Sequence, residues 1–146
     1  MAQKQVKNIS ASVRAKLLNL SKLQKVEFDS VLLQYFQERL LYRLSISQYK
    51  NNFILKGALL FLSLNMPRTR PTKDIDFLGI STKNSIHNIN NIFIEITKIS
   101  NNDGVTFDPQ SVSVQTIQED EQYEGVRVFL TGILGTARKK VQIDIG

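Results

Sequence analysis

The amino-acid sequence predicts an α+β fold in which N-terminal helices precede a mixed β-sheet. Two observations lead to this prediction. The first part of the chain carries apolar residues at helical spacing, in two segments without proline or glycine. The later part alternates short β-rich runs with helical segments and ends in several strands. We therefore expect a helical N-terminal segment at residues 1–50 and a core at residues 51–146 that is truncated at its C-terminal end.

Composition limits the class of protein. With 146 residues, of which 42% are hydrophobic, the chain can form one compact domain but not two ordinary ones. It contains no cysteine, which excludes disulfides and thiolate metal sites. The longest apolar region, Phe53–Leu64, is interrupted by Lys56 and Ser63 and is too short to span a bilayer. We expect a soluble, cytoplasmic protein without a membrane partner.

Positive charge is concentrated at the N-terminus. The net charge is +6, and residues 1–26 hold six of the 19 basic residues and none of the 13 acidic ones. The rest of the chain is therefore neutral. A basic arm on a neutral body suits a polyanionic partner such as RNA. On charge alone, the simpler interpretation is a solvated helix face.

Two helices are expected in the N-terminal segment. In the first, Leu17 and Leu20 follow helical spacing, and Ser10 or Ser12 is expected to cap its N-terminus. The second fits Phe28 to about Leu44, where the apolar residues recur three and four positions apart. Polar residues follow it and form a connection.

The core alternates between strands and helices. Helices are expected at Ala58–Leu62 and Ile86–Ile99, with a proline-containing loop at Met66–Lys73 between them. Gly135-Thr136 is expected to form the turn of a hairpin. The expected strands are Phe53–Leu55, Asp74–Leu78, Val105–Phe107, Val112–Ile117, Val126–Leu134 and Lys140–Ile145. The last of these alternates like a strand inside a sheet, and no helix follows to cover it, so we expect a fragment or a shortened form of a longer protein.

The most informative motif is Asp74-Ile75-Asp76. Residues two apart in a strand share one face, so the two carboxylates project together. Neighbouring carboxylates repel one another unless a cation lies between them, and Mg²⁺ prefers such hard oxygen ligands. Asp144, in a second strand with apolar neighbours, could add a third carboxylate and complete a two-metal site for phosphoryl transfer. An Asp-x-Asp pair by itself is weak evidence for metal binding, because most such pairs are solvated.

Residues around this motif are suited to phosphate. Gly57-Ala58 follows a strand and opens a helix, so the backbone can approach a ligand closely and offer N–H groups to phosphate. The simpler interpretation is a tight turn. Arg70 and Lys73 could neutralise phosphate charge, or serve only solubility. Lys56 and Lys140 are alternative cations, and the sequence does not decide among them.

The same residues carry a resemblance to a known family. The chain resembles the AbiEii/AbiGii toxin family of nucleotidyltransferases over essentially its whole length. The stretches that carry the likeness include Leu55-Lys56-Gly57-Ala58-Leu59-Leu60-Phe61, Arg70-Pro71-Thr72-Lys73-Asp74-Ile75-Asp76-Phe77-Leu78-Gly79 and Gln142-Ile143-Asp144-Ile145-Gly146.

The resemblance implies a polymerase-β-like nucleotidyltransferase fold and a metal-dependent enzyme. It implies Asp74, Asp76 and Asp144 as catalytic metal ligands for Mg²⁺, with Mn²⁺ as an alternative. The implied nucleotide-binding residues are Lys56, Gly57, Ala58, Arg70 and Thr72. Such a protein is the toxin of a bacterial toxin–antitoxin or abortive-infection pair, and it moves a nucleotide from an NTP to an acceptor hydroxyl. The implied partners are an RNA acceptor, for some relatives the 3′ end of tRNA, and a cognate antitoxin.

Two alternatives stay open at this point. The first is a truncated or degenerate transferase domain that binds nucleotide, RNA or a partner without catalysis. Relatives continue into a helical C-terminal region, and the sequence ends before it. The second is a protein-interaction domain whose acidic residues are surface charges. Metal binding without nucleotide incorporation would favour the first, and stability that does not respond to Mg²⁺ would favour the second.

Overall fold

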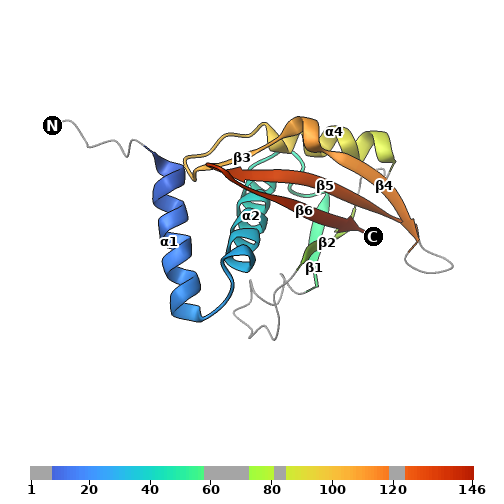
Figure 1. Ribbon diagram of the computed structural model, residues 1–146. Helices are drawn as coiled ribbons and strands as arrows, with labels where there is room; N and C mark the ends of the chain where they lie inside the picture. Colours follow the sequence, from blue (N-terminus) through green and yellow to red (C-terminus); the bar gives the residue numbers. More distant parts are fainter. Residues whose placement is uncertain (1–7, 58–72, 81–84, 119–123) are drawn as a thin grey trace.

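A computed structural model describes residues 8–57, 73–80, 85–118 and 124–146. These residues form three α-helices, a 3₁₀-helix and a six-stranded mixed sheet, which confirms the predicted α+β class (Figure 1). The helices are α1 (Ile9–Gln24), α2 (Phe28–Ser45), α4 (Ile86–Thr97) and the 3₁₀-helix η1 (Pro109–Ser111). The strands are β1 (Phe53–Lys56), β2 (Asp74–Gly79), β3 (Val105–Phe107), β4 (Ser113–Gln118), β5 (Glu124–Leu134) and β6 (Ala137–Ile145). None of the described helices has the length and apolar character needed to cross a membrane.

The sheet is built around one long hairpin. Its strand order is β1-β2-β6-β5-β3, and β4 also pairs with β5. Strands β5 and β6 pair along nine positions and are joined by the predicted Gly135-Thr136 turn, in which Gly135 has a φ of +61°. Strand β2 pairs in parallel with β6, whereas the other pairings are antiparallel. This parallel pair brings residues 74–77 beside residues 142–145, although they lie far apart in the chain.

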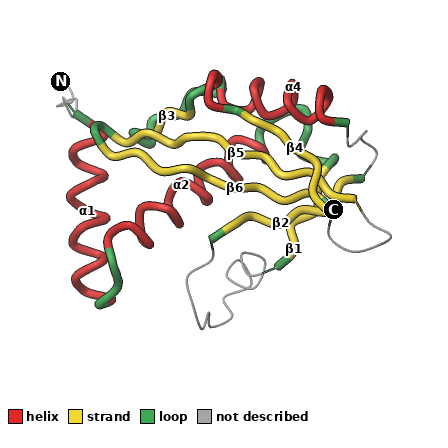
Figure 2. Tube along the Cα trace, turned by 45° about the vertical axis from the view of Figure 1, so that its right-hand side comes forward, coloured by secondary structure: helices red, strands yellow, loops and turns green. Residues whose placement is uncertain are grey.

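The two faces of the sheet differ in character. The inner face carries Ile75 of β2 and Ile143 of β6, both 0% exposed, and all three α-helices contribute residues to the same core. Because side chains alternate along a strand, the polar residues of β2 and β6 project from the opposite side. We call this second side the open face. Figure 2, turned by 45°, shows α1 and α2 grouped at one end of the sheet and α4 along its other part.

Helix α2 packs closely on β5 because β5 has no side chain at Gly132. A Cβ at this position would lie 2.8 Å from Cγ of Phe36, whose ring is 0% exposed. The same ring meets Phe107 of β3 edge to face, with centroids 6.2 Å apart. Aromatic pairs of this kind add to the free energy gained from burial alone. The large Phe36 ring fills the space left by the missing side chain at Gly132, and this contact positions α2 on the sheet.

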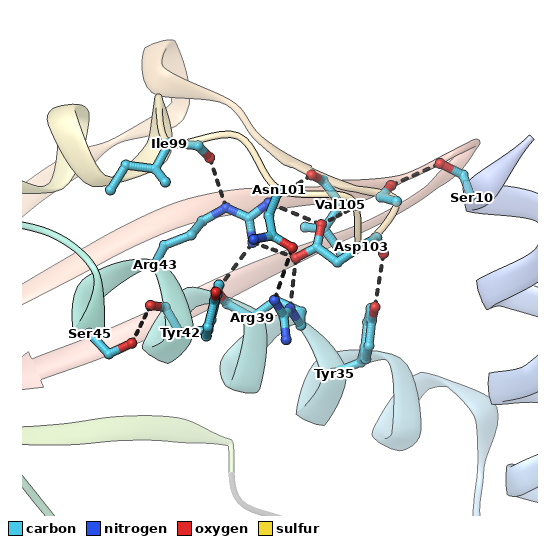
Figure 3. A network of polar contacts seen from close by, with 11 residues as sticks. Ser10, Tyr35, Arg39, Tyr42, Arg43, Ser45, Ile99, Asn101, Asp103 and Val105 are labelled. Atoms are coloured by element: carbon cyan, nitrogen blue, oxygen red, sulfur yellow. Dashed lines mark hydrogen bonds and ion pairs between the residues drawn. The ribbon is translucent and has the colours of Figure 1, made fainter. Parts of the chain in front are cut away.

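A buried ion-pair network joins α2 to the turn before β3 (Figure 3). Arg43, 1% exposed, donates from Nη1 and Nη2 to the two carboxylate oxygens of Asp103 at 2.7 and 3.1 Å. Arg39 donates from Nε to the same carboxylate at 2.7 Å. The hydroxyl of Tyr35 donates to the Asp103 carbonyl, and that of Ser10 donates to the Gly104 carbonyl, both at 2.8 Å. The network therefore ties both N-terminal helices to the sheet.

Some boundaries differ from the predictions. The N-cap of α1 is Asn8, whose side chain accepts from the Ala11 N–H at 3.0 Å, so the expected Ser10 or Ser12 cap is wrong. Ser10 instead forms a tertiary hydrogen bond, which local spacing does not reveal. Strand β6 begins at Ala137, three residues earlier than expected, because the two-residue turn lets pairing resume at once. The expected helix Ala58–Leu62 and residues 66–72 of the expected loop lie outside the described residues.

Candidate functional site

Three carboxylates meet on the open face, where β2 and β6 run in parallel. Asp76 pairs in register with Asp144, and Asp74 pairs with Gln142. One oxygen from each of Asp74, Asp76 and Asp144 lies within 4.8 Å of the other two. The structure thus brings together all three acids that the sequence singled out as metal ligands.

Alternation along the two strands places the acids on this face. Ile75 and Phe77 of β2 and Ile143 and Ile145 of β6 are 0–3% exposed in the core. Burying these four side chains stabilises the fold by roughly 1.5–3 kcal/mol each. A slip of one residue in the register would expose them and bury the carboxylates instead. The hydrophobic core therefore fixes the direction in which the acids point.

Asp74 lies in an environment that disfavours its charge. Burial raises the pKa of Asp74 above its ordinary value, and the neighbouring negative charge of Asp144 raises it further, while Arg127 acts in the opposite direction. Asp144 itself is only 8% exposed. A divalent cation between the three carboxylates would offset this repulsion. Carboxylate oxygens are hard ligands, and three carboxylates so close together therefore fit the ligand set that Mg²⁺ prefers.

Sequence reasoning gave Arg127 no role, yet it contacts the candidate site directly. Arg127 of β5 lies opposite Asp144 in register. Its Nε and Nη2 donate to the two oxygens of Asp144 at 2.8 and 3.1 Å, in the two-pronged geometry typical of arginine and carboxylate. Gln142 adds two longer hydrogen bonds of 3.3 Å to the same carboxylate. The sequence held one indication of this role: Arg127 is a single charged residue between the apolar residues Val126 and Val128, and Asp144 stands out by the same pattern.

Gly57, at the end of β1, lies directly against the candidate site. Its φ is +77°, and a Cβ placed there would lie 2.6 Å from Oδ2 of Asp76. Glycine is therefore required both by the backbone conformation and by the position of the carboxylate. Lys56 is exposed and lies opposite Asp76 in the antiparallel pairing of β1 with β2. Because residues paired in register share a face of the sheet, Lys56 projects on the same face as Asp76.

Other predicted residues are placed differently. Lys73 is exposed and directly precedes β2. Lys140 lies on the open face of β6, four residues before Asp144, and its Nζ is 4.9 Å from the centroid of the Phe129 ring. Ala58, Arg70 and Thr72 lie outside the described residues. The described part of the site therefore consists of acids at the centre with basic side chains on the strands beside them.

Comparison with known protein families finds a match over most of the chain. The family described as nucleotidyl transferase AbiEii toxin, type IV toxin–antitoxin system, matches residues 39–146. No curated protein matches the chain. Among solved structures, the chain is similar to a crystal structure described as a nucleotidyltransferase from H. pylori, with 12% identity and a TM-score of 0.48. The match covers 83% of this chain and 46% of that one, so the chain spans less than half the length of that protein.

Proposed function

Because the chain belongs to the AbiEii nucleotidyl transferase toxin family of type IV toxin–antitoxin systems, we propose that it is a metal-dependent transferase that moves a nucleotide from an NTP to an acceptor hydroxyl. One observation carries the proposal. Asp74, Asp76 and Asp144 present oxygens within 4.8 Å of one another on a single face of the sheet. Residues from two distant segments form this cluster at the cost of mutual repulsion, which a bound cation would remove.

The three acids have distinct positions in this proposal. Asp74 and Asp76, two residues apart on β2, would share the metal ions, and Asp144 would complete the site from β6. Bound Mg²⁺ would withdraw charge from the phosphate oxygens and orient them. Arg127 donates two hydrogen bonds to Asp144 and so fixes the orientation of this carboxylate. Gly57 lets the backbone after β1 come close to Asp76, where the phosphates would lie.

The proposed reaction is an in-line displacement at phosphorus. The acceptor hydroxyl oxygen forms a bond to the α-phosphorus of the NTP, and the bond from this phosphorus to the bridging oxygen breaks. Pyrophosphate leaves with the electron pair, and the hydroxyl proton passes to a carboxylate oxygen of Asp144 or to solvent. Lys56 lies opposite Asp76 in register and would balance charge on the leaving phosphates.

Partners and location follow from the family and are part of the proposal. We infer a cytoplasmic toxin with a cognate antitoxin, and an RNA acceptor such as the 3′ end of tRNA. Mg²⁺ is the expected cofactor, with Mn²⁺ as the alternative, because both are hard cations that carboxylates bind. The basic residues of α1 support an RNA partner, since Arg14, Lys16 and Lys22 are exposed.

Nucleotide incorporation tests the proposed activity. The protein is incubated with each α-labelled NTP, Mg²⁺ and total tRNA, and label on RNA is measured. We expect Asp76→Asn to lower incorporation by at least about 100-fold, because a catalytic metal contributes several kcal/mol. Asp29→Asn makes the same chemical change at an exposed helix position and should leave the rate unchanged. Equal incorporation by the Asp76 variant would contradict the assignment.

A second measurement separates catalysis from binding. Mg²⁺ that binds the native site raises the melting temperature, because it stabilises only the folded state. We expect this shift in the unmodified protein and its loss in Asp76→Asn. A Mg²⁺ shift without incorporation of any NTP would favour a domain that binds without turnover. The absence of both the Mg²⁺ shift and nucleotide incorporation would favour a protein-interaction domain with surface acids.

A further inference from the structure

The open face continues beyond the acids along the β5–β6 hairpin and changes its charge. Every second residue of β6 faces this side, in the order Asp144, Gln142, Lys140 and Arg138 toward the turn. Lys140 and Arg138 are exposed. The face is therefore acidic where β6 meets β2 and basic toward the hairpin turn.

An aromatic ring lies between these two zones. Phe129 of β5 pairs in register with Gln142, and it is partly exposed on the open face instead of packing in the core. The ammonium group of Lys140 lies over this ring, 4.9 Å from its centroid, so a base that stacks on the ring takes the place of the ammonium group, which then pairs with a phosphate. An aromatic surface beside cations is the combination that binds single-stranded nucleic acid, since bases stack on the ring and phosphates pair with the cations.

The basic zone leads toward the N-terminal helix. Helix α1 begins beside the hairpin turn (Figure 1), where a Cβ at Gly135 would lie 3.8 Å from Ser10. The first two turns of α1 carry the exposed residues Arg14 and Lys16. The distance from Asp144 to Arg138 along β6 is about 20 Å at roughly 3.3 Å per residue. A stacked strand rising about 3.4 Å per nucleotide would place about six nucleotides along it.

We propose that the open face of the β5–β6 hairpin binds the acceptor as a single-stranded nucleic acid, with its 3′ end at the acids. Phe129 stacks on a base near this end, and Lys140 and Arg138 contact the phosphates that follow. The inference rests on the proposed transferase function, because it places the acceptor hydroxyl beside Asp144. It adds to that function the surface that binds the acceptor, the direction in which the nucleic acid runs along it, and three contact residues.

Binding of fluorescent oligonucleotides to the whole chain tests this surface without catalysis. Anisotropy is measured with a single-stranded oligoribonucleotide, and a DNA of the same sequence shows whether the sugar matters. We expect Phe129→Leu to weaken binding roughly five- to hundred-fold, which corresponds to the loss of one stacked base. We expect the double variant Arg138→Gln, Lys140→Gln to bind more weakly and to lose about 0.7 from the salt slope for each phosphate contact removed.

Lys139→Gln is the matched control. It removes one positive charge from the same strand, half of what the double variant removes, but Lys139 faces the helices and pairs with Asp29 at 3.1 Å. Surface pairs of this kind contribute little to stability, so the variant should fold normally. We expect its oligonucleotide affinity to stay within about twofold of the unmodified protein, as for surface charges away from an interface. Equal weakening by Lys139→Gln and by the open-face variants would overturn the proposal, because net charge alone would then explain binding.

Crosslinking keeps the inference testable if a variant folds poorly. An oligoribonucleotide with 4-thiouridine near its 3′ end is irradiated with the unmodified protein, and the attached peptides are identified. Crosslinks within residues 127–142 support the surface, and crosslinks confined to α2 or α4 overturn it. Label incorporation together with unchanged binding in all variants would overturn the surface and leave the transferase standing. Binding that depends on Phe129 supports the surface even where no label is incorporated.

Discussion

Two acidic groups in this molecule, Asp103 and the cluster on β2 and β6, have opposite surroundings. Asp103, beside α2, is surrounded by donors: two arginines contact its carboxylate, and its Oδ1 accepts from the Val105 N–H at 3.0 Å (Figure 3). The acids of β2 and β6 instead lie close to one another, and Arg127 contacts Asp144. The first group is complete in the folded chain, whereas in our proposal the second is completed by a cation.

The pKa values of the two groups follow this difference. Burial alone would raise the pKa of Asp103, but the hydrogen bonds from Arg43, Arg39 and the Val105 N–H outweigh it and lower the pKa. Asp103 therefore stabilises the fold at neutral pH, and this stability is lost as pH falls through its lowered pKa. The pKa of Asp74 is raised, so its charge costs stability at neutral pH. Such a local conflict is expected where a ligand binds.

Breaking the complete group should have the largest effect. Arg43→Met removes the buried guanidinium and leaves Asp103 without its two-pronged partner. We expect unfolding free energy to fall by about 3–5 kcal/mol, the usual cost of an uncompensated buried charge. Urea denaturation measures it. Arg39→Met is the control: its side chain is 24% exposed, so solvent screens its pair with Asp103 and the loss should be about 1 kcal/mol. Equal losses would show that the depth of Arg43 does not matter.

A side chain added at Gly57 would crowd the incomplete group, and this substitution tests how closely Gly57 approaches Asp76. Gly57→Ala and Gly135→Ala both place a side chain at positive φ, which costs about 1–2 kcal/mol. Only the first also places a Cβ 2.6 Å from the Asp76 carboxylate, whereas the second meets nothing nearer than 3.8 Å. We expect similar losses of stability in urea, but loss of the Mg²⁺-induced rise in melting temperature in Gly57→Ala alone. A normal Mg²⁺ response in Gly57→Ala would contradict a metal position beside Asp76.

Neutralising one acid of the incomplete group should have the smallest effect on the free energy of unfolding, and it should stabilise the fold instead of destabilising it. Without metal, the raised pKa of Asp74 means that the native state binds more protons than the unfolded state between the ordinary and the raised value. Stability therefore falls as pH rises through this window. We expect Asp74→Asn to be more stable than the unmodified protein at pH 7, by less than about 1 kcal/mol.

The gain in Asp74→Asn should disappear below the ordinary pKa, where the native acid is protonated in both states. Saturating Mg²⁺ should reverse the order at pH 7, because only the unmodified protein retains the full ligand set. Chemical denaturation at several pH values, with and without Mg²⁺, measures both effects. A variant less stable than the unmodified protein at neutral pH without metal would show that the acids do not strain the fold.

The sequence alone determined the elements and the direction of the acids. Helical spacing placed α2, and alternation with buried Ile75 and Ile143 put Asp74, Asp76 and Asp144 on the polar sides of their strands. The Gly135-Thr136 turn was also readable, since two residues between β-rich runs indicate a hairpin. These features depend on neighbours only a few residues away, and periodicity records such neighbours directly.

Only the tertiary structure decided which residues meet. The parallel pairing of β2 with β6 joins Asp76 to Asp144, and the register of the hairpin places Arg127 on the same carboxylate. The pairing of Arg43 with Asp103 likewise joins residues 60 positions apart. Sequence periodicity tells which way a side chain points but not what lies opposite it. Partners across strands are set by packing of the whole core, and therefore the three acids could be proposed from the sequence, whereas the contact of Arg127 with Asp144 could not.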